Sequence, residues 1–253
     1  MYTTINNVKI HYHIFGEGEP IILLHGWGGS TKSLIPLSRE LVKKGFYVYM
    51  LDLPGFGKSE LPLKAYTLDD YAILVEEYVK RFHQGAIAIF GHSFGGSVAI
   101  KIASRKKIDI NKLILCNSSG IREKRFMVVL LGKFATIMKI IFSLPLLRDI
   151  YPFVRKVSYY YILRQRDYID HQDKKETFQN IVSEDIIPDL PNIMVRTLLL
   201  WGENDKDTPV SQANIMKLKI KDSRLKIVEK AGHGLPLKDP RFVAEEINNL
   251  VKH

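Results

Sequence analysis

A serine between closely spaced glycines stands at a change from strand to helix in this chain. The stretch reads Gly91-His92-Ser93-Phe94-Gly95. Residues 86–90 have the apolar run of a buried strand, and residues 93–105 have helical spacing. A sharp strand-to-helix turn presents its serine at the helix N-terminus and needs glycines where the backbone is crowded. The pattern predicts that Ser93 is a nucleophile, against the alternative of an ordinary helix-capping serine.

A nucleophilic serine needs a base, and the base needs a group that orients it. His233 follows the last predicted strand, and Asp205 follows the strand before it. Both would therefore lie at the carboxyl ends of parallel strands, where such sheets place their sites. The chain order Ser93, Asp205, His233 fits this topology. Asp207 is a rival acid, and we prefer Asp205 because it lies closer to the strand end. Taken singly, each of these acids and the histidine also fits an ordinary turn.

The oxyanion that forms during attack on a carbonyl needs two backbone N–H donors. Phe94, directly after the serine, supplies one, and Trp27 in the glycine-rich loop 25–29 is predicted to supply the other. A plain tight turn is the alternative for that loop. We expect three further residues to contact substrate: His92, Gly26 and Leu235.

The sequence carries no dinucleotide fingerprint and no phosphate-binding loop, so we predict no cofactor. His11 and His13 share one face of a predicted strand, but no third ligand accompanies them. We therefore expect them to face solvent and predict no metal site.

Strands and helices alternate at both ends of the chain, which predicts an α/β protein with a mainly parallel sheet. An Asn6-Asn7 turn predicts an opening hairpin. The middle, residues 121–191, shows helical, tyrosine-rich stretches but no clear strand, so we interpret it as a helical cap or lid. The predicted core is residues 1–120 and 192–253. The predicted strands and helices of the core span residues 8–15, 21–24, 33–44, 46–51, 68–82, 86–90, 93–105, 112–116, 197–201, 225–228 and 239–251.

One apolar stretch, residues 126–147, is long enough to suggest a membrane span. Lys133 and Lys139 fall on one polar stripe of its helical wheel, which favours an amphipathic helix and no transmembrane segment. The N-terminus lacks the basic and apolar regions of a signal peptide. A single cysteine, Cys116, excludes an internal disulfide. We expect a cytoplasmic protein.

The motifs together resemble the α/β-hydrolase superfamily along the whole chain. They are His25-Gly26-Trp27-Gly28, the stretch 52–59, the turn around Ser93, Gly202-Glu203-Asn204-Asp205 and Gly232-His233. The resemblance implies an eight-stranded sheet with helices on both faces and a helical cap inserted after the sixth strand. It also implies a mainly structural role for Asp52.

Departures from other branches narrow this resemblance. Ser93 is not Asp, so the chain does not resemble haloalkane dehalogenases or epoxide hydrolases, and it lacks the Gly-Gly-Ser-Trp-Gly form of proline iminopeptidases. Two motifs, His25-Gly26-Trp27-Gly28 and Asp52-Leu53-Pro54-Gly55-Phe56-Gly57, are similar in sequence to those of pimeloyl-carrier-protein methyl ester esterases.

We predict a cofactor-free serine hydrolase that cleaves a carboxylic ester with a small, medium or aromatic acyl group. The alternatives are a C–C bond hydrolase, an acyltransferase, a carrier-protein methyl ester esterase and a non-catalytic ligand receptor on the same fold.

The net charge of +10 is unevenly distributed. Residues 101–166 carry 15 Lys and Arg against 3 Asp and Glu, while the remainder is slightly acidic. Charge runs commonly face solvent for solubility. The functional alternative is a surface for an acidic partner, an anionic membrane or a carboxylate-bearing substrate. Because no recognition motif accompanies the charge, we do not expect nucleic-acid binding.

Overall fold

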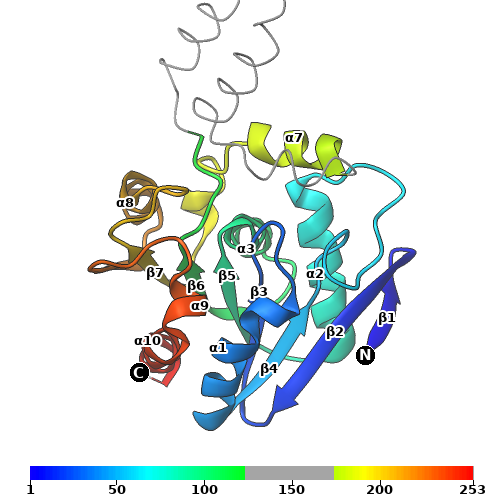
Figure 1. Ribbon diagram of the computed structural model, residues 1–253, viewed down its shortest axis with the longest axis horizontal. Coiled ribbons are helices and arrows are strands. Elements are labelled where there is room, and N and C mark those ends of the chain that lie inside the picture. The colour runs from blue at the N-terminus through cyan, green and yellow to red at the C-terminus, as the bar shows by residue number, and fades with distance from the viewer. Residues whose placement is uncertain (123–173, 253) are drawn as a thin grey trace, which may run out of the picture. The chain divides into compact units, whose positions relative to one another are not determined.

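Eight strands form a single sheet in the computed structural model, which describes residues 1–122 and 174–252. The strand order is β1-β2-β4-β3-β5-β6-β7-β8 (Figure 1). β1 and β2 pair antiparallel, β2 pairs antiparallel with β4, and every other pair is parallel. The predicted eight-stranded, mainly parallel sheet is confirmed. The strands are β1 (Tyr2–Ile5), β2 (Val8–Gly16), β3 (Glu19–Leu24), β4 (Phe46–Leu51), β5 (Ile87–His92), β6 (Ile110–Cys116), β7 (Arg196–Gly202) and β8 (Ser223–Val228).

The opening hairpin is confirmed between β1 and β2. Asn6 and Asn7 have φ angles of 49° and 63°, and Ile5 pairs with Val8 across the turn. Two consecutive residues with positive φ match the twist of the flanking strands, and asparagine tolerates this conformation well.

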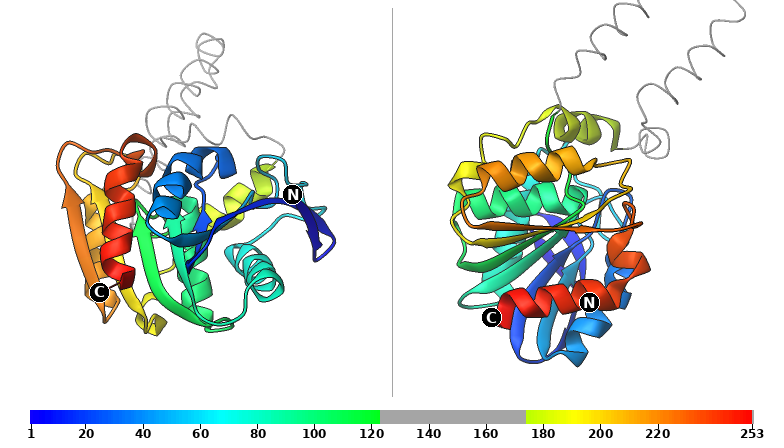
Figure 2. Two further views of the ribbon diagram at one scale, coloured as in Figure 1. Left: turned by 90° about the horizontal axis from the view of Figure 1, so that it is seen from below. Right: turned by 90° about the vertical axis from the view of Figure 1, so that its left-hand side faces the viewer.

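Helices cover both faces of the sheet, as predicted (Figure 2). Residues of α2, α3 and α8 pack into one apolar cluster, and residues of α1, α9 and α10 pack into the other. The second cluster includes Leu34 from α1 and Val243 from α10, both fully buried. The helices are α1 (Thr31–Lys43), α2 (Leu68–Phe82), α3 (Phe94–Arg105), α7 (Lys175–Ser183), η3 (Leu190–Asn192), α8 (Val210–Lys219), α9 (Leu235–Lys238) and α10 (Pro240–Lys252).

The beginning of α2 shows why several boundaries could be predicted closely. The Thr67 side chain accepts a hydrogen bond from the Asp70 N–H, and the Asp70 carboxylate accepts one from the Thr67 N–H. This reciprocal arrangement satisfies donors that the first helical turn leaves without a partner. The helix begins at Leu68, as the capping pattern predicts.

His11 differs from its prediction. Its side chain is buried, and its Nδ1 atom lies 2.8 Å from Asp52 Oδ2. Asp52 also accepts hydrogen bonds from the N–H groups of Thr31 and Lys58, at 2.6 and 2.8 Å. Burial raises the pKa of Asp52, but the hydrogen bonds outweigh burial and lower it overall. The expectation that His11 faces solvent is wrong, because this buried carboxylate recruits His11 as one of its partners.

The long connection between β6 and β7 is described in part. The predicted amphipathic helix over 126–147 and the tyrosines at 151, 159–161 and 168 lie outside the described residues. By its contacts, the stretch from Lys174 onward belongs to the same unit as Met1–Arg122. A cap over residues 121–191 stays a prediction. Among the described helices, none is long and apolar enough to cross a membrane.

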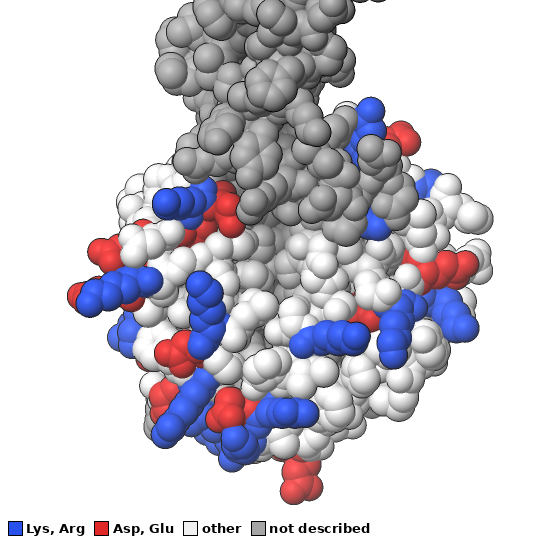
Figure 3. Space-filling view, viewed as in Figure 1, with Lys and Arg blue, Asp and Glu red and all other residues white. Residues whose placement is uncertain are grey.

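Two cations of the basic stretch are paired with acidic side chains. Lys101 on α3 lies 2.5 Å from Glu184 and 3.0 Å from Asp189. One turn further, Arg105 lies 2.9 Å from Glu76. Over the face drawn in Figure 3, acidic side chains are interspersed with Lys and Arg among the described residues. These two positive charges are therefore already compensated within the fold.

Candidate functional site

Ser93 lies in the sharp turn between β5 and α3. Its φ angle is 52° and its ψ angle −118°, a strained conformation for a residue with a side chain. Backbone hydrogen bonds hold it there. Its N–H donates to the Cys116 carbonyl at 3.1 Å, and its carbonyl accepts from Gly96 at 2.9 Å and from Ser119 at 3.1 Å. The turn is thus fixed by the end of the neighbouring strand β6 and by the first turn of α3.

The two glycines that flank Ser93 are required by close backbone approach. A Cβ atom at Gly91 would collide with the Gly95 carbonyl oxygen, and one at Gly95 would collide with the Leu24 carbonyl oxygen. These positions bring α3 directly against the ends of β3 and β5. The spacing of glycine around the serine therefore follows from sterics, as the sequence pattern predicts.

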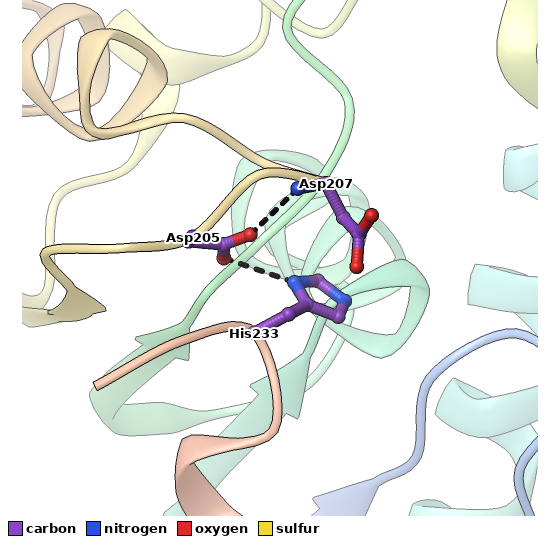
Figure 4. Close-up of side chains that lie close together, drawn as sticks. All are labelled: Asp205, Asp207 and His233. Carbon is purple, nitrogen blue, oxygen red and sulfur yellow. Dashed lines mark hydrogen bonds and ion pairs between the residues drawn. The ribbon is translucent and has the colours of Figure 1, made fainter. Parts of the chain in front are cut away.

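Asp205 and His233 meet at the same edge of the sheet (Figure 4). Asp205 follows β7, His233 follows β8, and Asp205 Oδ2 lies 2.9 Å from His233 Nδ1. Since an ionised carboxylate only accepts hydrogen bonds, Nδ1 carries the proton and Nε2 of the neutral ring is a proton acceptor. A histidine in this state is equipped to act as a general base.

The Asp205 carboxylate is buried and surrounded by donors. Its Oδ1 accepts from the backbone N–H groups of Asp207 and Thr208, each at 2.9 Å. Burial raises the pKa of Asp205, but hydrogen bonds from His233 and Thr208 outweigh it and lower the pKa to about 2. Asp207 has an exposed side chain and contributes its N–H to Asp205 (Figure 4). Of the two rival acids, Asp205 is the one hydrogen-bonded to His233 Nδ1.

His92 links the turn at Ser93 to the loop of His233. Its Nε2 atom lies 2.9 Å from the His233 carbonyl oxygen, and the two rings are 5.1 Å apart. Burial, followed by the nearby His233, lowers the pKa of His92 to about 4. The neutral ring therefore donates its Nε2–H to the His233 backbone. Contact between His92 and substrate stays a prediction.

The loop after β3 passes directly beside Ser93. A Cβ atom at Gly26 would lie 3.2 Å from the Ser93 Cβ, so Gly26 borders the serine. The Trp27 ring packs edge-on against Phe94, with centroids 5.4 Å apart. Phe94 begins α3, and the first N–H groups of a helix have no partner within it. The roles of Trp27 and Phe94 as oxyanion donors stay predictions.

Leu235, the third predicted substrate contact, begins α9 shortly after His233. It is 2% exposed and belongs to the apolar cluster beneath α1, α9 and α10. In this structure its side chain packs in the core, and contact with substrate stays a prediction.

Two polar residues of the site were not predicted from the sequence. Asn117 is fully buried, and its side-chain N–H₂ donates to Asp205 Oδ2. The Thr208 hydroxyl donates to the same oxygen at 2.7 Å. A signal for Asn117 was present, because it directly follows β6 and so lies at the edge that carries Ser93, Asp205 and His233. Thr208 could have been found as a hydroxyl residue in the loop of Asp205.

Among the described residues, Asp205, Asp207 and His233 form a cluster whose ligand-type atoms lie within 4.8 Å of one another. Both oxygens of Asp205 accept hydrogen bonds from N–H or O–H groups. This donor set suits a hydrogen-bonded carboxylate better than a metal ligand, whose lone pairs must face the ion.

Comparison with known proteins agrees with the fold. A model described as "Alpha/beta hydrolase family" matches residues 21–246. The AB hydrolase superfamily protein YisY of Bacillus subtilis is 28% identical over 98% of this chain and 96% of its own length. An esterase from Exiguobacterium antarcticum has a similar fold, with a TM-score of 0.77, 22% identity and coverage of 100% of this chain and 98% of the other.

Two further relatives carry more specific names. The 2-hydroxy-6-oxo-6-phenylhexa-2,4-dienoate hydrolase of Comamonas testosteroni is 25% identical over 90% of this chain and 86% of its own. The pimeloyl-[acyl-carrier protein] methyl ester esterase of Nitrosospira multiformis is 26% identical over 95% and 97%. The relatives thus include hydrolases with different substrates.

Proposed function

This chain belongs to the alpha/beta hydrolase family, and from that premise we propose that it is a serine hydrolase that cleaves a carboxylic ester through an acyl-Ser93 intermediate. The observation that carries the proposal is the hydrogen bond between Asp205 and His233, 2.9 Å long, at the sheet edge where Ser93 occupies its strained turn. The nucleophile, the base and the orienting acid then follow β5, β8 and β7, three parallel strands of one sheet.

In the first half-reaction, Ser93 Oγ attacks the ester carbonyl carbon and its proton passes to His233 Nε2. The backbone N–H groups of Trp27 and Phe94 stabilise the oxyanion. Asp205 holds the His233 ring in orientation and stabilises its positive charge. When the tetrahedral intermediate collapses, the C–O bond to the alcohol breaks and His233 returns the proton to the leaving oxygen.

In the second half-reaction, water replaces the alcohol. His233 Nε2 takes a proton from the water as its oxygen attacks the acyl carbon. Collapse of the second intermediate breaks the bond to Ser93 Oγ, which recovers the proton from His233. The products are a carboxylic acid and free Ser93, so no redox partner or cofactor is required.

An aromatic cluster beside Ser93 supports a medium-length or aromatic acyl group. The Trp27 ring contacts Phe56, Phe94 and Phe178, with centroids between 4.8 and 5.4 Å apart. Aromatic side chains provide large apolar contact areas and pack edge-to-face or offset against other rings. A cytoplasmic site of action stays a prediction.

C–C bond hydrolysis is the second candidate, because one relative is named as the hydrolase of 2-hydroxy-6-oxo-6-phenylhexa-2,4-dienoate. That compound contains no ester, so its hydrolysis breaks a carbon–carbon bond. The same histidine, acid and oxyanion donors serve both reactions. A carrier-protein methyl ester is a further ester substrate, supported by the relative from Nitrosospira multiformis. An acidic carrier would suit the basic stretch, although Lys101 and Arg105 are already paired.

A substrate series tests the proposal. p-Nitrophenyl esters from acetate to palmitate, and the dienoate above, are offered to the wild type and to Ser93→Ala and His233→Ala. We expect hydrolysis of one chain-length range by the wild type and a loss of about 1,000-fold or more in kcat in both variants. Turnover of the dienoate alone would favour the C–C candidate, and equal rates in all three proteins would exclude the proposed site.

A further inference from the structure

The Asp205 carboxylate receives more hydrogen bonds than its link to His233 requires. Besides His233 Nδ1, its Oδ2 atom accepts from Asn117 Nδ2 and, at 2.7 Å, from Thr208 Oγ1. Its Oδ1 atom accepts from two backbone N–H groups of its own loop. Both carboxylate oxygens are thereby fixed, and the plane of the carboxylate has no freedom to turn.

Asn117 is built to hold one orientation. It is fully buried with a φ angle of 47°, and its N–H donates to the Leu200 carbonyl at 3.0 Å, which anchors it between β6 and β7. The Cys116 thiol lies 3.6 Å from Asn117 Oδ1 and offers a weak donor to it. The opposite side of the amide, Nδ2, therefore faces Asp205. The reversed amide would set two oxygens against each other, which excludes it.

Thr208 lies between the acid and the base. Its Oγ1 atom is 2.7 Å from Asp205 Oδ2, 3.0 Å from the Asn117 carbonyl and 3.3 Å from His233 Nδ1. The acceptors for its single proton are Asp205 Oδ2 and the Asn117 carbonyl oxygen, and its lone pairs face the His233 Nδ1–H. The Trp201 indole donates to the Thr208 carbonyl at 2.7 Å and fixes this loop against β7.

We propose that Asn117 and Thr208 are positioning residues, which hold Asp205 Oδ2 on His233 Nδ1 while His233 gains and loses its proton. The assignment rests on the proposed function, because positioning matters only if His233 acts as a base. Asn117 acts through Asp205, and Thr208 acts mainly through Asp205, because its hydroxyl lies closer to Asp205 Oδ2, at 2.7 Å, than to His233 Nδ1, at 3.3 Å. A merely structural role would affect stability, whereas a positioning role affects turnover only while the Asp205 carboxylate is present.

The test uses Thr208→Val, which keeps the shape and removes the hydroxyl, and Thr208→Ser, which restores it. Asn117→Gly removes the amide without penalising the positive φ angle. Thr197→Val is the matched control, because the Thr197 hydroxyl is also buried but donates to the Val195 carbonyl and not to Asp205. Each variant is also made on the Asp205→Asn background, and Tm, kcat, KM and the rate of fluorophosphonate labelling are measured.

We expect Thr208→Val and Asn117→Gly to lower kcat by about 10- to 100-fold with little change in KM, and Thr208→Ser to recover most of it. On the Asp205→Asn background the same substitutions should change the labelling rate by less than about 2-fold, since residues that act as a unit are not additive. Thr197→Val should keep the wild-type kcat and labelling rate.

The following results would overturn the assignment. Folded Thr208→Val that keeps the wild-type kcat contradicts it. So does a Thr208→Val substitution that lowers the labelling rate as much on the Asp205→Asn background as on the wild-type background. Both outcomes can be read even if Asn117→Gly fails to fold. A wild type without labelling at Ser93 overturns the proposed function and this assignment together. Normal wild-type labelling with unaffected variants overturns the assignment alone.

Discussion

Asp205 Oδ2 and His233 Nδ1 lie 2.9 Å apart, although the two residues are separated by 28 positions in the chain. The ends of the parallel strands β7 and β8 bring them together. Asp207 lies close by with an exposed carboxylate, and it donates its backbone N–H to Asp205 Oδ1. The two acids therefore differ in what they contribute to His233.

Asp205→Asn and Asp207→Asn separate these contributions. Asp205→Asn places an amide against His233 Nδ1 and favours the wrong ring tautomer, so we expect kcat to fall by about 1,000- to 10,000-fold. Asp207→Asn preserves the N–H that Asp205 accepts, so we expect a change below about 5-fold. Steady-state kinetics with the best ester of the series checks both variants. Equal losses of kcat would contradict the assignment of Asp205 as the orienting acid.

Gly95→Ala tests the close packing of the turn at Ser93. Its new Cβ would collide with the Leu24 carbonyl oxygen, so α3 must move away from β3. We expect the free energy of unfolding to fall by about 2 kcal/mol or more. Gly234→Ala is the control, because the nearest atom to its Cβ is 3.8 Å away and its φ angle is −81°. Urea unfolding should show a change within about 0.5 kcal/mol there.

The pH dependence of stability tests the neutral state of His92. Its pKa is lowered from 6.5 to about 4 in the folded chain, mainly by burial. Between these values the unfolded chain binds a proton that the folded chain does not, so stability is lost as the pH falls from 6.5 towards 4. The loss from this group amounts to about 3 kcal/mol.

His92→Gln keeps a side-chain N–H donor but does not titrate. We expect its unfolding free energy to depend less steeply on pH between 6.5 and 4 than that of the wild type. Some slope remains, because burial also lowers the pKa of His25. Urea titrations at half-unit pH steps measure both slopes, and identical slopes would contradict a neutral His92.

Substitution of Lys101 tests how much a partly buried ion network contributes to the free energy of unfolding. Its side chain is 11% exposed and bridges Glu184 and Asp189. Lys101→Met leaves both carboxylates without this cation, and we expect a loss of about 1–3 kcal/mol. The pair of Lys80 and Glu77 on α2 is exposed, so Lys80→Met should cost less than about 0.5 kcal/mol. Similar losses in thermal unfolding of the two variants would contradict this ranking.

The sequence predicts the sheet and most helices because their signals are local. The capping pair of Thr67 and Asp70 and the Asn6-Asn7 turn each place a boundary without tertiary information. Helix α8 was not predicted, because only two of its residues, Ala213 and Met216, are buried and its hydrophobic pattern is weakly amphipathic. Local periodicity carries little information on such a helix.

The site residues also differ in whether a local sequence pattern identifies them. Ser93, Asp205 and His233 stand at strand ends within recognisable motifs, so a sequence pattern identifies them. Asn117 has no such motif, and its contact with Asp205 depends on how β6 and β7 lie side by side. The buried His11 was misjudged for the same reason, because its partner Asp52 lies 41 residues away.

Covalent labelling of Ser93 tests the central claim most directly. The wild type and Ser93→Ala are incubated with a fluorophosphonate probe, and the modified peptide is located by mass spectrometry. A nucleophilic serine displaces fluoride from phosphorus and retains the phosphonyl group on Oγ. We expect one adduct, on Ser93, that is absent from Ser93→Ala and forms much more slowly in His233→Ala. A wild type that stays unlabelled, or Ser93→Ala that labels equally well, would contradict it.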